Sequence, residues 1–217
     1  TNWAKSQSIS IKEALKVFSF VSNNSDEFPI LPIDLIKEAE ALAFKSEVKM
    51  GGAGDIDLIY ALTKLSRAIN VVETGVAYGW SSLSILYALK DVKGSKLVSI
   101  DMPYPRMNNE DFVGIVVPNK LRSKWKLIRE PDRNGITKAI KYFGNKIDLC
   151  HYDSDKSYWG RCYGYPLLWN ALSPGGIFIS DDIQDNFSFR EFAESKKLKF
   201  AIVECEKKYV GIIQKPF

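Results

Sequence analysis

Two runs of charged side chains each follow an apolar segment of strand length. The run Asp-Ser-Asp-Lys at 153–156 follows residues 147–152, and the pair Asp-Asp at 181–182 follows residues 176–180. As parallel strands of one sheet, these segments place three or four carboxylates at the same edge. Acids held together repel each other and need a counter-charge, which a hard divalent cation with oxygen ligands supplies. The pattern therefore predicts a cation-binding cluster of acids.

A glycine-containing turn follows another expected strand, within residues 71–82 (VVETGVAYGWSS). The strand ends in Glu73, and Gly75 and Gly79 then permit close backbone approach or a positive φ. In an open parallel sheet, nucleotide-like ligands bind at this position. The helix that begins near Ser81 offers free N–H groups to an anion such as a carboxylate. The dinucleotide spacing G-x-G-x-x-G is absent, which disfavours NAD.

A second acid ends the next expected strand, where Asp101 precedes Met102. An acid at this place can accept hydrogen bonds from both hydroxyls of a ribose. Asp101 could also do no more than cap a turn. Its position 28 residues after Glu73, in a strand–helix–strand unit, favours ribose binding.

The elements that must position these residues follow from hydrophobic periodicity. The first fifty residues read as two helices, with a capping box at Ser10 and Glu13, and Asp55 can cap the helix that follows. The expected strands are 71–73, 96–100, 126–129, 147–152, 176–180, 200–204 and 210–214. Helical segments separate most of the first five, which predicts a parallel sheet, whereas only residues 206–209 separate the last two, which predicts an antiparallel hairpin. A terminal hairpin is unlike the sheet of a standard dehydrogenase.

The stretch from Glu73 to Ser82 and the Asp101-Met102 pair resemble motifs I and II of S-adenosylmethionine (SAM)-dependent O-methyltransferases. The likeness is to the catechol, caffeoyl-CoA and macrocin (sugar) O-methyltransferase group, and it covers about residues 50 to 217. It implies a class I, doubly wound Rossmann-like α/β fold, with a seven-stranded, mostly parallel sheet and an antiparallel last strand. We therefore expect an N-terminal helical extension at 1–50 and a methyltransferase domain at 51–217.

The resemblance also implies a set of SAM contacts. Glu73, Gly75 and Ser81 would hold the amino-acid end of SAM, Asp101 the ribose, and Met102 the adenine. Asp132 and Arg133 occupy the position that meets the adenine edge, although Glu130-Pro131-Asp132 departs from the usual Gly-x-Ser. The full set of expected cofactor-binding residues is Glu73, Gly75, Val76, Ala77, Gly79, Ser81, Asp101, Met102, Asp132 and Asp153.

The same resemblance assigns the acid cluster to Mg²⁺, with Asp153, Asp181 and Asp182 as ligands. Catechol-type enzymes have Asn at the last position and sugar-type enzymes have Asp, so Asp182 favours the sugar type. Two neighbours of Asp153 compete for the role of general base. Lys156 matches the lysine of the catechol-type motif, and Asp155 matches the base proposed for the sugar type.

Composition excludes several other classes of protein. The 217 residues are 46% hydrophobic and 26% charged, with a net charge of +4, and no basic block is dense enough to predict nucleic-acid binding. No apolar run reaches the roughly 18 residues of a membrane span. The three cysteines are odd in number and lack zinc spacing, so we interpret them as small buried hydrophobic residues in a reducing cytoplasm. His151 stands in an apolar run and is interpreted as a core residue. The segment 158–165 (YWGRCYGY) could line a substrate pocket or simply pack its helix.

The leading hypothesis is a Mg²⁺-assisted, SAM-dependent O-methyltransferase acting on a small hydroxylated molecule, a sugar or natural product. The alternatives are metal-independent methylation with Lys156 or Asp155 as base, and a SAM-binding module without turnover. The expected partner is a small-molecule acceptor, with neither nucleic acid nor membrane. A homo-oligomer is left open.

Overall fold

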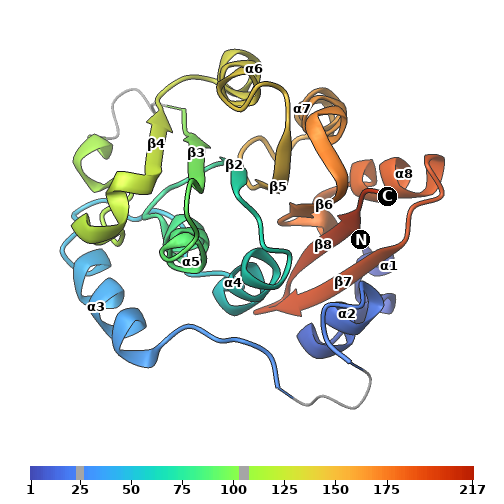
Figure 1. Cartoon of the computed structure of the whole chain (residues 1–217), viewed down its shortest axis with the longest axis horizontal. Coiled ribbons are helices and arrows are strands. Elements are labelled where there is room, and N and C mark those ends of the chain that lie inside the picture. The colour runs from blue at the N-terminus through green and yellow to red at the C-terminus, as the bar shows by residue number, and fades with distance from the viewer. Residues whose placement is uncertain (23–26, 103–107) are drawn as a thin grey trace.

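A single mixed sheet forms the centre of the molecule. The computed structural model describes residues 1–22, 27–102 and 108–217. Within them the sheet has eight strands in the order β1-β7-β8-β6-β5-β2-β3-β4 (Figure 1). The strands are β1 (Ser8–Ile9), β2 (Asn70–Thr74), β3 (Lys96–Ile100), β4 (Trp125–Ile128), β5 (Ile147–Tyr152), β6 (Leu172–Ser180), β7 (Phe200–Cys205) and β8 (Lys208–Gln214). Neighbouring strands run parallel except where β8 pairs with β6 and β7.

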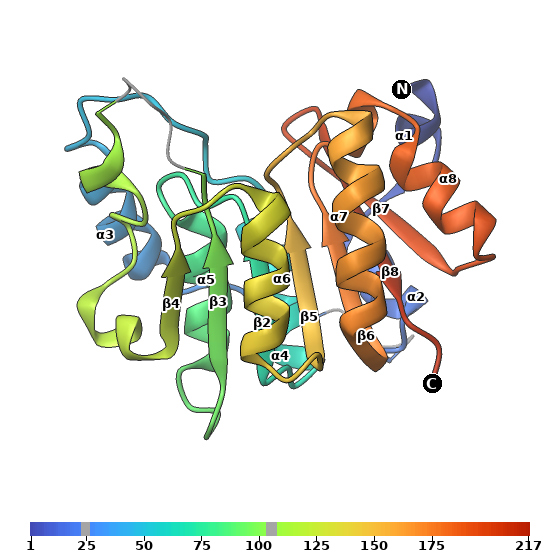
Figure 2. The ribbon, with the colours of Figure 1, turned by 90° about the horizontal axis from the view of Figure 1, so that it is seen from above.

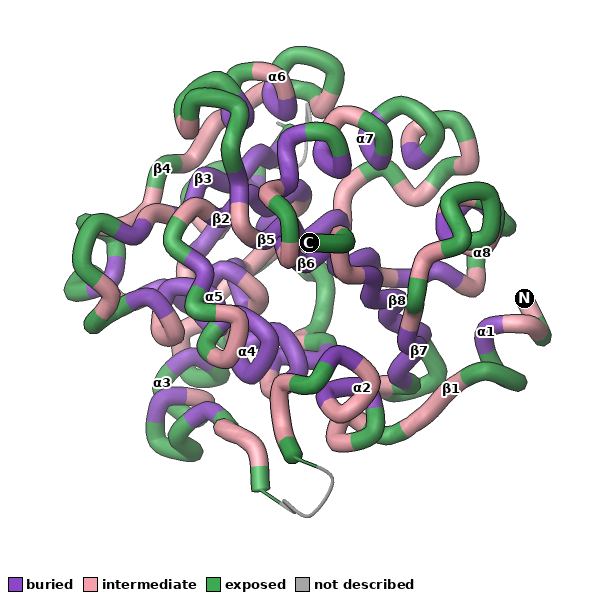
Figure 3. Tube along the Cα trace, turned by 45° about the vertical axis from the view of Figure 1, so that its right-hand side comes forward, coloured by how far each residue is buried: buried purple, intermediate pink, exposed green. Residues whose placement is uncertain are grey.

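Helices cover both faces of this sheet, as Figure 2 shows. The α-helices are α1 (Asn2–Ser6), α2 (Ile11–Val17), α3 (Ile33–Ala43), α4 (Ile56–Leu65), α5 (Trp80–Leu89), α6 (Asp132–Tyr142), α7 (Tyr158–Ala171) and α8 (Ser188–Ser195), with 3-10 turns η1 (Glu110–Phe112), η2 (Asn119–Lys124) and η3 (Ile183–Asp185). Side chains of α2 to α5 share one core with Val71 of β2, and side chains of α1, α6, α7 and α8 share another with Val72. Successive strand residues point to opposite faces, so a strand buried on both faces reads as a continuous apolar run. Figure 3 shows these strands buried.

The doubly wound α/β fold with an antiparallel last strand is confirmed. The sheet has one strand more than expected, because Ser8 and Ile9 pair in parallel with Ile202 and Val203 of β7. A two-residue strand carries no periodic pattern that sequence analysis can detect. The strand β6 also begins earlier than expected, at Leu172.

Residues 1–22 and 27–50 of the N-terminal segment form three α-helices, α1, α2 and α3, rather than two. The capping box is confirmed, since Ser10 Oγ accepts a hydrogen bond from the Glu13 amide and the Glu13 carboxylate accepts one from the Ser10 amide. Ala14 and Leu15 of α2 are fully buried in the same core as residues of the sheet. A division of the chain at residue 50 stays a prediction.

The register of the parallel strands brings four chain segments to one edge. Thr74 pairs with Ile100 and with Tyr152, and Tyr152 pairs with Ser180. The residue after each of these four strand ends therefore leaves the sheet at the same level, and these residues are Gly75, Asp101, Asp153 and Asp181. Among the described helices, none is long and apolar enough to cross a bilayer.

Candidate active site

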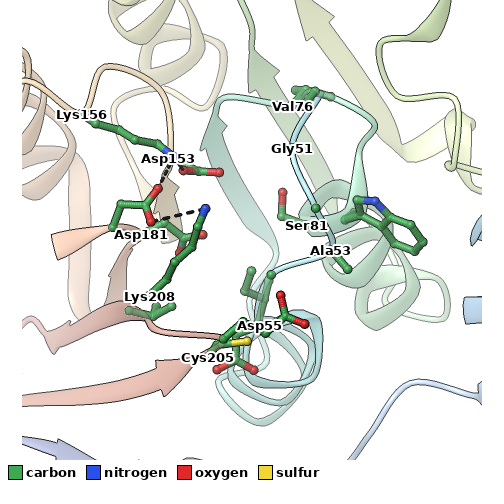
Figure 4. A pocket seen from close by; sticks show the side chains of 18 residues that line it. Gly51, Ala53, Asp55, Val76, Ser81, Asp153, Lys156, Asp181, Cys205 and Lys208 are labelled. Atoms are coloured by element: carbon green, nitrogen blue, oxygen red, sulfur yellow. Dashed lines mark hydrogen bonds and ion pairs between the residues drawn. The ribbon is translucent and has the colours of Figure 1, made fainter. Parts of the chain in front are cut away.

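Two adjoining cavities open at this edge. The larger has a volume of about 800 Å³ and is lined by Lys49, Met50, Gly51, Gly75, Val76, Ala77, Asp101, Met102, Asn109, Pro131, Asp132, Arg133, Asp153, Ser154, Asp155 and Lys156. The smaller, about 200 Å³, is lined by Gly51, Gly52, Ala53, Gly54, Asp55, Ile59, Val76, Ala77, Trp80, Ser81, Asp153, Lys156, Asp181, Asp182, Cys205, Glu206, Lys208 and Val210 (Figure 4). They share Gly51, Val76, Ala77, Asp153 and Lys156. A molecule in one cavity therefore meets a molecule in the other beside Asp153 and Lys156.

The turn after β2 fits closely against the neighbouring strand end. Gly75 has φ +80°, and a Cβ atom there would lie 2.3 Å from the Asp153 backbone oxygen. Its amide donates a hydrogen bond to the Ile100 carbonyl at 2.8 Å. Gly79, with φ +91°, is the N-cap of α5. Gly75 therefore lets the turn lie against the end of β5, and both glycines have the positive φ that the sequence predicts.

Glu73 lies beneath this turn and is fully buried. Its carboxylate accepts hydrogen bonds from the hydroxyls of Ser81 at 2.6 Å, Ser82 at 2.5 Å and Ser99 at 2.6 Å. Ser81 lines the smaller cavity, but Glu73 and Gly79 line neither. Glu73 therefore orients Ser81, and its direct contact with a cofactor stays a prediction.

His151 links the turn to the acid cluster. Its imidazole is fully buried, with Nε2 3.2 Å from Asp181 Oδ1 and Nδ1 3.7 Å from Glu73 Oε1. Burial lowers its pKa, but the carboxylates of Asp181 and Glu73 outweigh burial and raise the pKa to about 10. The side chain is a core residue, as expected, and it also carries a positive charge between two acids. Sequence analysis missed this link, although Glu73 and His151 are register partners on adjacent strands.

The expected ribose acid is held by a partner that sequence analysis missed. Asp101 is 7% exposed and its Oδ1 accepts a hydrogen bond from the Val76 amide at 3.2 Å. Its other oxygen accepts a hydrogen bond from the Arg129 guanidinium, at the end of β4. Burial raises the pKa of Asp101. The Val76 amide and Arg129 each hold one oxygen of the carboxylate, and Asp101 lines the larger cavity.

Asp132 and Met102 also line the larger cavity, as expected. Asp132 begins α6 and accepts a hydrogen bond from Ser154 Oγ at 2.5 Å, which connects the β4 and β5 ends. Burial raises the pKa of Asp132. Met102 is 46% exposed, so its thioether is free to pack on a ligand.

The acid cluster, Asp153, Asp181 and Asp182, borders the smaller cavity, and two lysines form ion pairs with its members. Lys156 Nζ lies 3.2 Å from Asp153 Oδ1 and also donates to Asp182 Oδ2. Lys208 Nζ, from β8, lies 3.5 Å from Asp182 Oδ1. Figure 4 shows both ammonium groups directed at the acids. The sequence predicts the meeting of Asp153 with the pair 181–182 but not the presence of Lys208.

These contacts set the ionisation of the cluster. Burial and the Asp181 charge raise the pKa of Asp153 to about 6. Burial lowers the pKa of Lys156, but the carboxylates of Asp153 and Asp182 outweigh it and hold the pKa above its usual value. Burial raises the pKa of Asp182, but Lys156, together with Gln184 and Lys208, outweighs burial and the net shift of the pKa is downward. Lys156 is therefore an ammonium ion.

Asp155 takes a different place. It lines the larger cavity but not the smaller one. Its Oδ1 accepts a hydrogen bond from the Ser157 amide at 3.0 Å. Only Asp153 and Lys156, of the three residues predicted to be catalytic, border both cavities.

None of residues 158–165 borders either of these two cavities. Arg161 is fully buried and donates to the backbone oxygens of Asp181 at 3.0 Å and Asp182 at 2.9 Å. It thereby holds Asp182, which has φ +51°. Trp159 is exposed on the outer face of α7, and Tyr165 packs in the core with its hydroxyl 2.6 Å from Ser180 Oγ. The helix-packing alternative fits these positions.

Known structures share this architecture. Cofactor-bound Rv0187 from MTB superposes with a TM-score of 0.67 at 12% identity, over 86% of this chain and 92% of that one. The O-methyltransferase from Bacillus cereus in complex with SAH gives 0.65 at 13% identity, over 94% and 100%. The O-methyltransferase TomG from Streptomyces achromogenes, involved in tomaymycin synthesis and in complex with SAM, gives 0.64 at 14% identity, over 95% and 99%. At these identities the likeness shows the fold.

A family model gives the classification. A search of curated proteins found no match to the sequence. The model described as a methyltransferase domain matches residues 72–183, which is more than half of the chain. The matched segment runs from the strand that carries Glu73 to the acid pair at 181–182. This match and the shared fold confirm the resemblance drawn from the motifs: the chain belongs to the methyltransferase domain family.

Proposed function

We propose that the protein transfers a methyl group from SAM to a hydroxyl oxygen of a small molecule. The observation that carries the proposal is the junction of the two cavities at Asp153 and Lys156. Methyl transfer is an in-line displacement, so donor and acceptor must approach one point from opposite sides. The acceptor oxygen forms a bond to the methyl carbon, the carbon–sulfur bond breaks, and the hydroxyl proton passes to a base.

The larger cavity suits the donor. Its volume of about 800 Å³ lies within the range of small-molecule sites, roughly 300–1,000 Å³. When bound there, SAM supplies a methyl group activated by a sulfonium charge. Asp101 would accept hydrogen bonds from the ribose, and Met102 would pack on the adenine. Ser81, oriented by Glu73, lines the smaller cavity and not the larger one, so its contact with the amino-acid end of SAM stays a prediction.

The Asp101 role gives a testable prediction. Asp101→Ala should weaken SAM binding about ten- to hundredfold, since hydrogen bonds to a charged acceptor contribute roughly 1.5–3 kcal/mol. Titration calorimetry with SAM measures the change. Asp91→Ala, which removes an acid that is 86% exposed, serves as the control and should bind SAM as the parent does. Unchanged affinity in Asp101→Ala would place the ribose elsewhere.

We assign removal of the acceptor hydroxyl proton to the acids beside Lys156. Because Lys156 is an ammonium ion, it cannot itself accept the proton, but its charge lowers the pKa of a hydroxyl placed next to it. Asp153 borders both cavities and has a pKa near neutrality, which suits a general base. We propose that Asp153 and Lys156 act as a pair on the acceptor hydroxyl.

Mg²⁺ assistance is a second form of this proposal, favoured by the three carboxylates that border one cavity. Their oxygen atoms match the preference of a hard cation. No group of three His, Cys, Asp or Glu side chains in the described part of the chain is placed to hold a metal. Lys156 and Lys208 face the acids. A bound cation would therefore compete with these ammonium groups. Asp153, Asp181 and Asp182 would hold it, and it would lower the pKa of a bound hydroxyl; Asp155 would then be the remaining base.

Metal binding is testable by its effect on unfolding. A cation at ten times its Kd stabilises the folded state by about 1.4 kcal/mol, which corresponds to a rise in Tm of roughly 3–6 °C. We expect this rise with MgCl₂, its loss in Asp181→Asn, and a larger rise in Lys208→Met, where one competing ammonium is gone. SAM affinity should be the same in all three proteins. A Tm indifferent to millimolar Mg²⁺, with full activity in EDTA, would exclude the metal and leave the Asp153–Lys156 pair, or Asp155, to activate the hydroxyl.

The function itself is tested by product formation. SAM and a panel of hydroxylated acceptors, catechol and methyl glycosides among them, are incubated with the protein, and release of S-adenosylhomocysteine is measured. The expected result is release that depends on an acceptor. Tight SAM binding with no release on any acceptor would favour a SAM-binding module without turnover.

A further inference from the structure

Asp55 is a buried acid that the proposed reaction does not use. It lies at the N-cap of α4, lines the smaller cavity and is 7% exposed. Its Oδ1 accepts a hydrogen bond from the Leu58 amide at 3.3 Å. Its Oδ2 has no hydrogen-bond partner, and its carboxylate forms no ion pair, within residues 1–22, 27–102 and 108–217. One oxygen therefore has a structural role and the other has none, although buried polar atoms are ordinarily paired.

The cations of the cavity are engaged elsewhere. Lys156 and Lys208 face Asp153 and Asp182, and the imidazole of His151 faces Asp181. Asp55 lies next to Cys205 on the other side of the cavity, as Figure 4 shows. Burial and the Asp55 charge raise the pKa of Cys205 to about 11, so this neighbour is a neutral thiol.

An uncompensated carboxylate at this depth disfavours its own charge. Burial raises the pKa of Asp55 to about 6, with the Leu58 amide opposing the rise and the Asp181 charge adding to it. An incoming cation would relieve this cost, because it supplies the charge and the hydrogen-bond donor that the site lacks. The small cavity is lined by five acids, Asp55, Asp153, Asp181, Asp182 and Glu206, and by two lysines, Lys156 and Lys208, so the excess of acids disfavours an incoming anion.

The position of Asp55 connects it to the acceptor. A Cβ atom on the preceding residue, Gly54, would lie 4.0 Å from Asp181 Oδ2, so the 51–55 loop passes directly over the acid cluster. The cavity of about 200 Å³ is smaller than a typical drug-sized site, roughly 300–1,000 Å³, and has room for one ring of an acceptor. Trp80 and Ile59 supply an apolar wall.

From this geometry, and resting on the proposed function, we propose that Asp55 selects acceptors with a protonated amine near the hydroxyl that is methylated. The acceptor class is an amino alcohol, such as a ring with amino and hydroxyl substituents. The amine donates to the Asp55 carboxylate, which turns its buried Oδ2 toward the cavity on binding, while the hydroxyl lies beside Asp153 and Lys156. Asp55 is a specificity residue and takes no part in bond making.

The test separates this role from helix capping. Asp55→Asn and Asp55→Ser both keep a side-chain oxygen that can accept from the Leu58 amide, so both should fold with a Tm close to that of the parent. Asp34→Asn, which removes an exposed acid from the first turn of α3, is the matched control for lost charge. The probes are three methyl glycosides that differ in one substituent: methyl glucosaminide with an amine, methyl glucoside with a hydroxyl, and methyl glucuronide with a carboxylate.

Binding of each probe to the SAH-loaded protein is measured by titration calorimetry or saturation-transfer NMR. We expect the parent protein and Asp34→Asn to bind the amine at least about tenfold more tightly than the neutral glycoside, and the carboxylate most weakly. In both Asp55 variants the preference for the amine should fall to about twofold or less. Equal binding of the three probes by the parent, binding of none, or an unchanged preference in the Asp55 variants overturns the proposal. SAM affinity and SAH release test the proposed function independently of these outcomes.

Discussion

Replacement of Gly75 by alanine is expected to abolish measurable SAM binding and to lower Tm more than any other single change in the turn. The added Cβ would lie 2.3 Å from the Asp153 backbone oxygen and 2.8 Å from its carbonyl carbon, so backbone must move at the junction of the two cavities. The residue also has φ +80°, which costs a non-glycine residue about 1–2 kcal/mol. Calorimetric titration with SAM and thermal unfolding measure the two effects.

Gly94 provides a matched control, because it has nearly the same backbone conformation without the contact. Its φ is +76°, and a Cβ there would have nothing within 4 Å among the described residues. Gly94→Ala should lower Tm by roughly 2–8 °C through strain alone and leave SAM affinity unchanged. If Gly75→Ala behaves like Gly94→Ala, the close packing of the turn on Asp153 does not shape the donor cavity.

Asp153→Asn should reduce turnover by roughly 100-fold or more, the scale of a lost general base, while SAM affinity changes little. The amide is nearly the same size but can neither take a proton nor neutralise Lys156. The loss is expected whether Asp153 acts as a base or holds Mg²⁺, because both need its charge. Release of S-adenosylhomocysteine, measured at saturating SAM, reports the effect.

Asp155→Asn distinguishes the two forms of the mechanism. Its side chain lies two residues away and borders only the larger cavity. Turnover close to the parent value is expected if Asp153 takes the proton, and a loss as large as that of Asp153→Asn is expected if Asp155 does. Full activity in Asp153→Asn would contradict both forms.

The strands that carry the site could be predicted because each is buried on both faces. The range 147–152 matches β5 and 96–100 matches β3, and the acids that follow them meet where the parallel register places them. The capping role of Asp55 was also predictable, because it depends on an amide three residues away. Local and strongly periodic sequence signals are therefore sufficient to predict the strands and the helix cap that position the site.

The contacts that the sequence did not predict are long-range ones. Lys208 reaches Asp182 because a hairpin strand lies beside β6, and Arg129 reaches Asp101 across two strand ends. The burial of Arg161 could not be predicted, because α7 has aromatic residues on several sides and its pattern does not indicate which face turns inward. In each case the deciding quantity is the packing of one element on another, which residue spacing does not encode.

The position of β8 has a consequence for the order in which this molecule can assemble. This strand follows all the others in the sequence, yet it lies between β6 and β7, and β1 joins the sheet only through β7. During synthesis, β2 to β6 emerge before β7 and β8 and can pair among themselves. The strand β1 emerges before all of them, but it can join this sheet only after β7 and β8 have emerged. The amino-terminal segment thus stays outside the main sheet until residues 208–214, which join β7 to β6, leave the ribosome, and Lys208 reaches the acid cluster in that same final step.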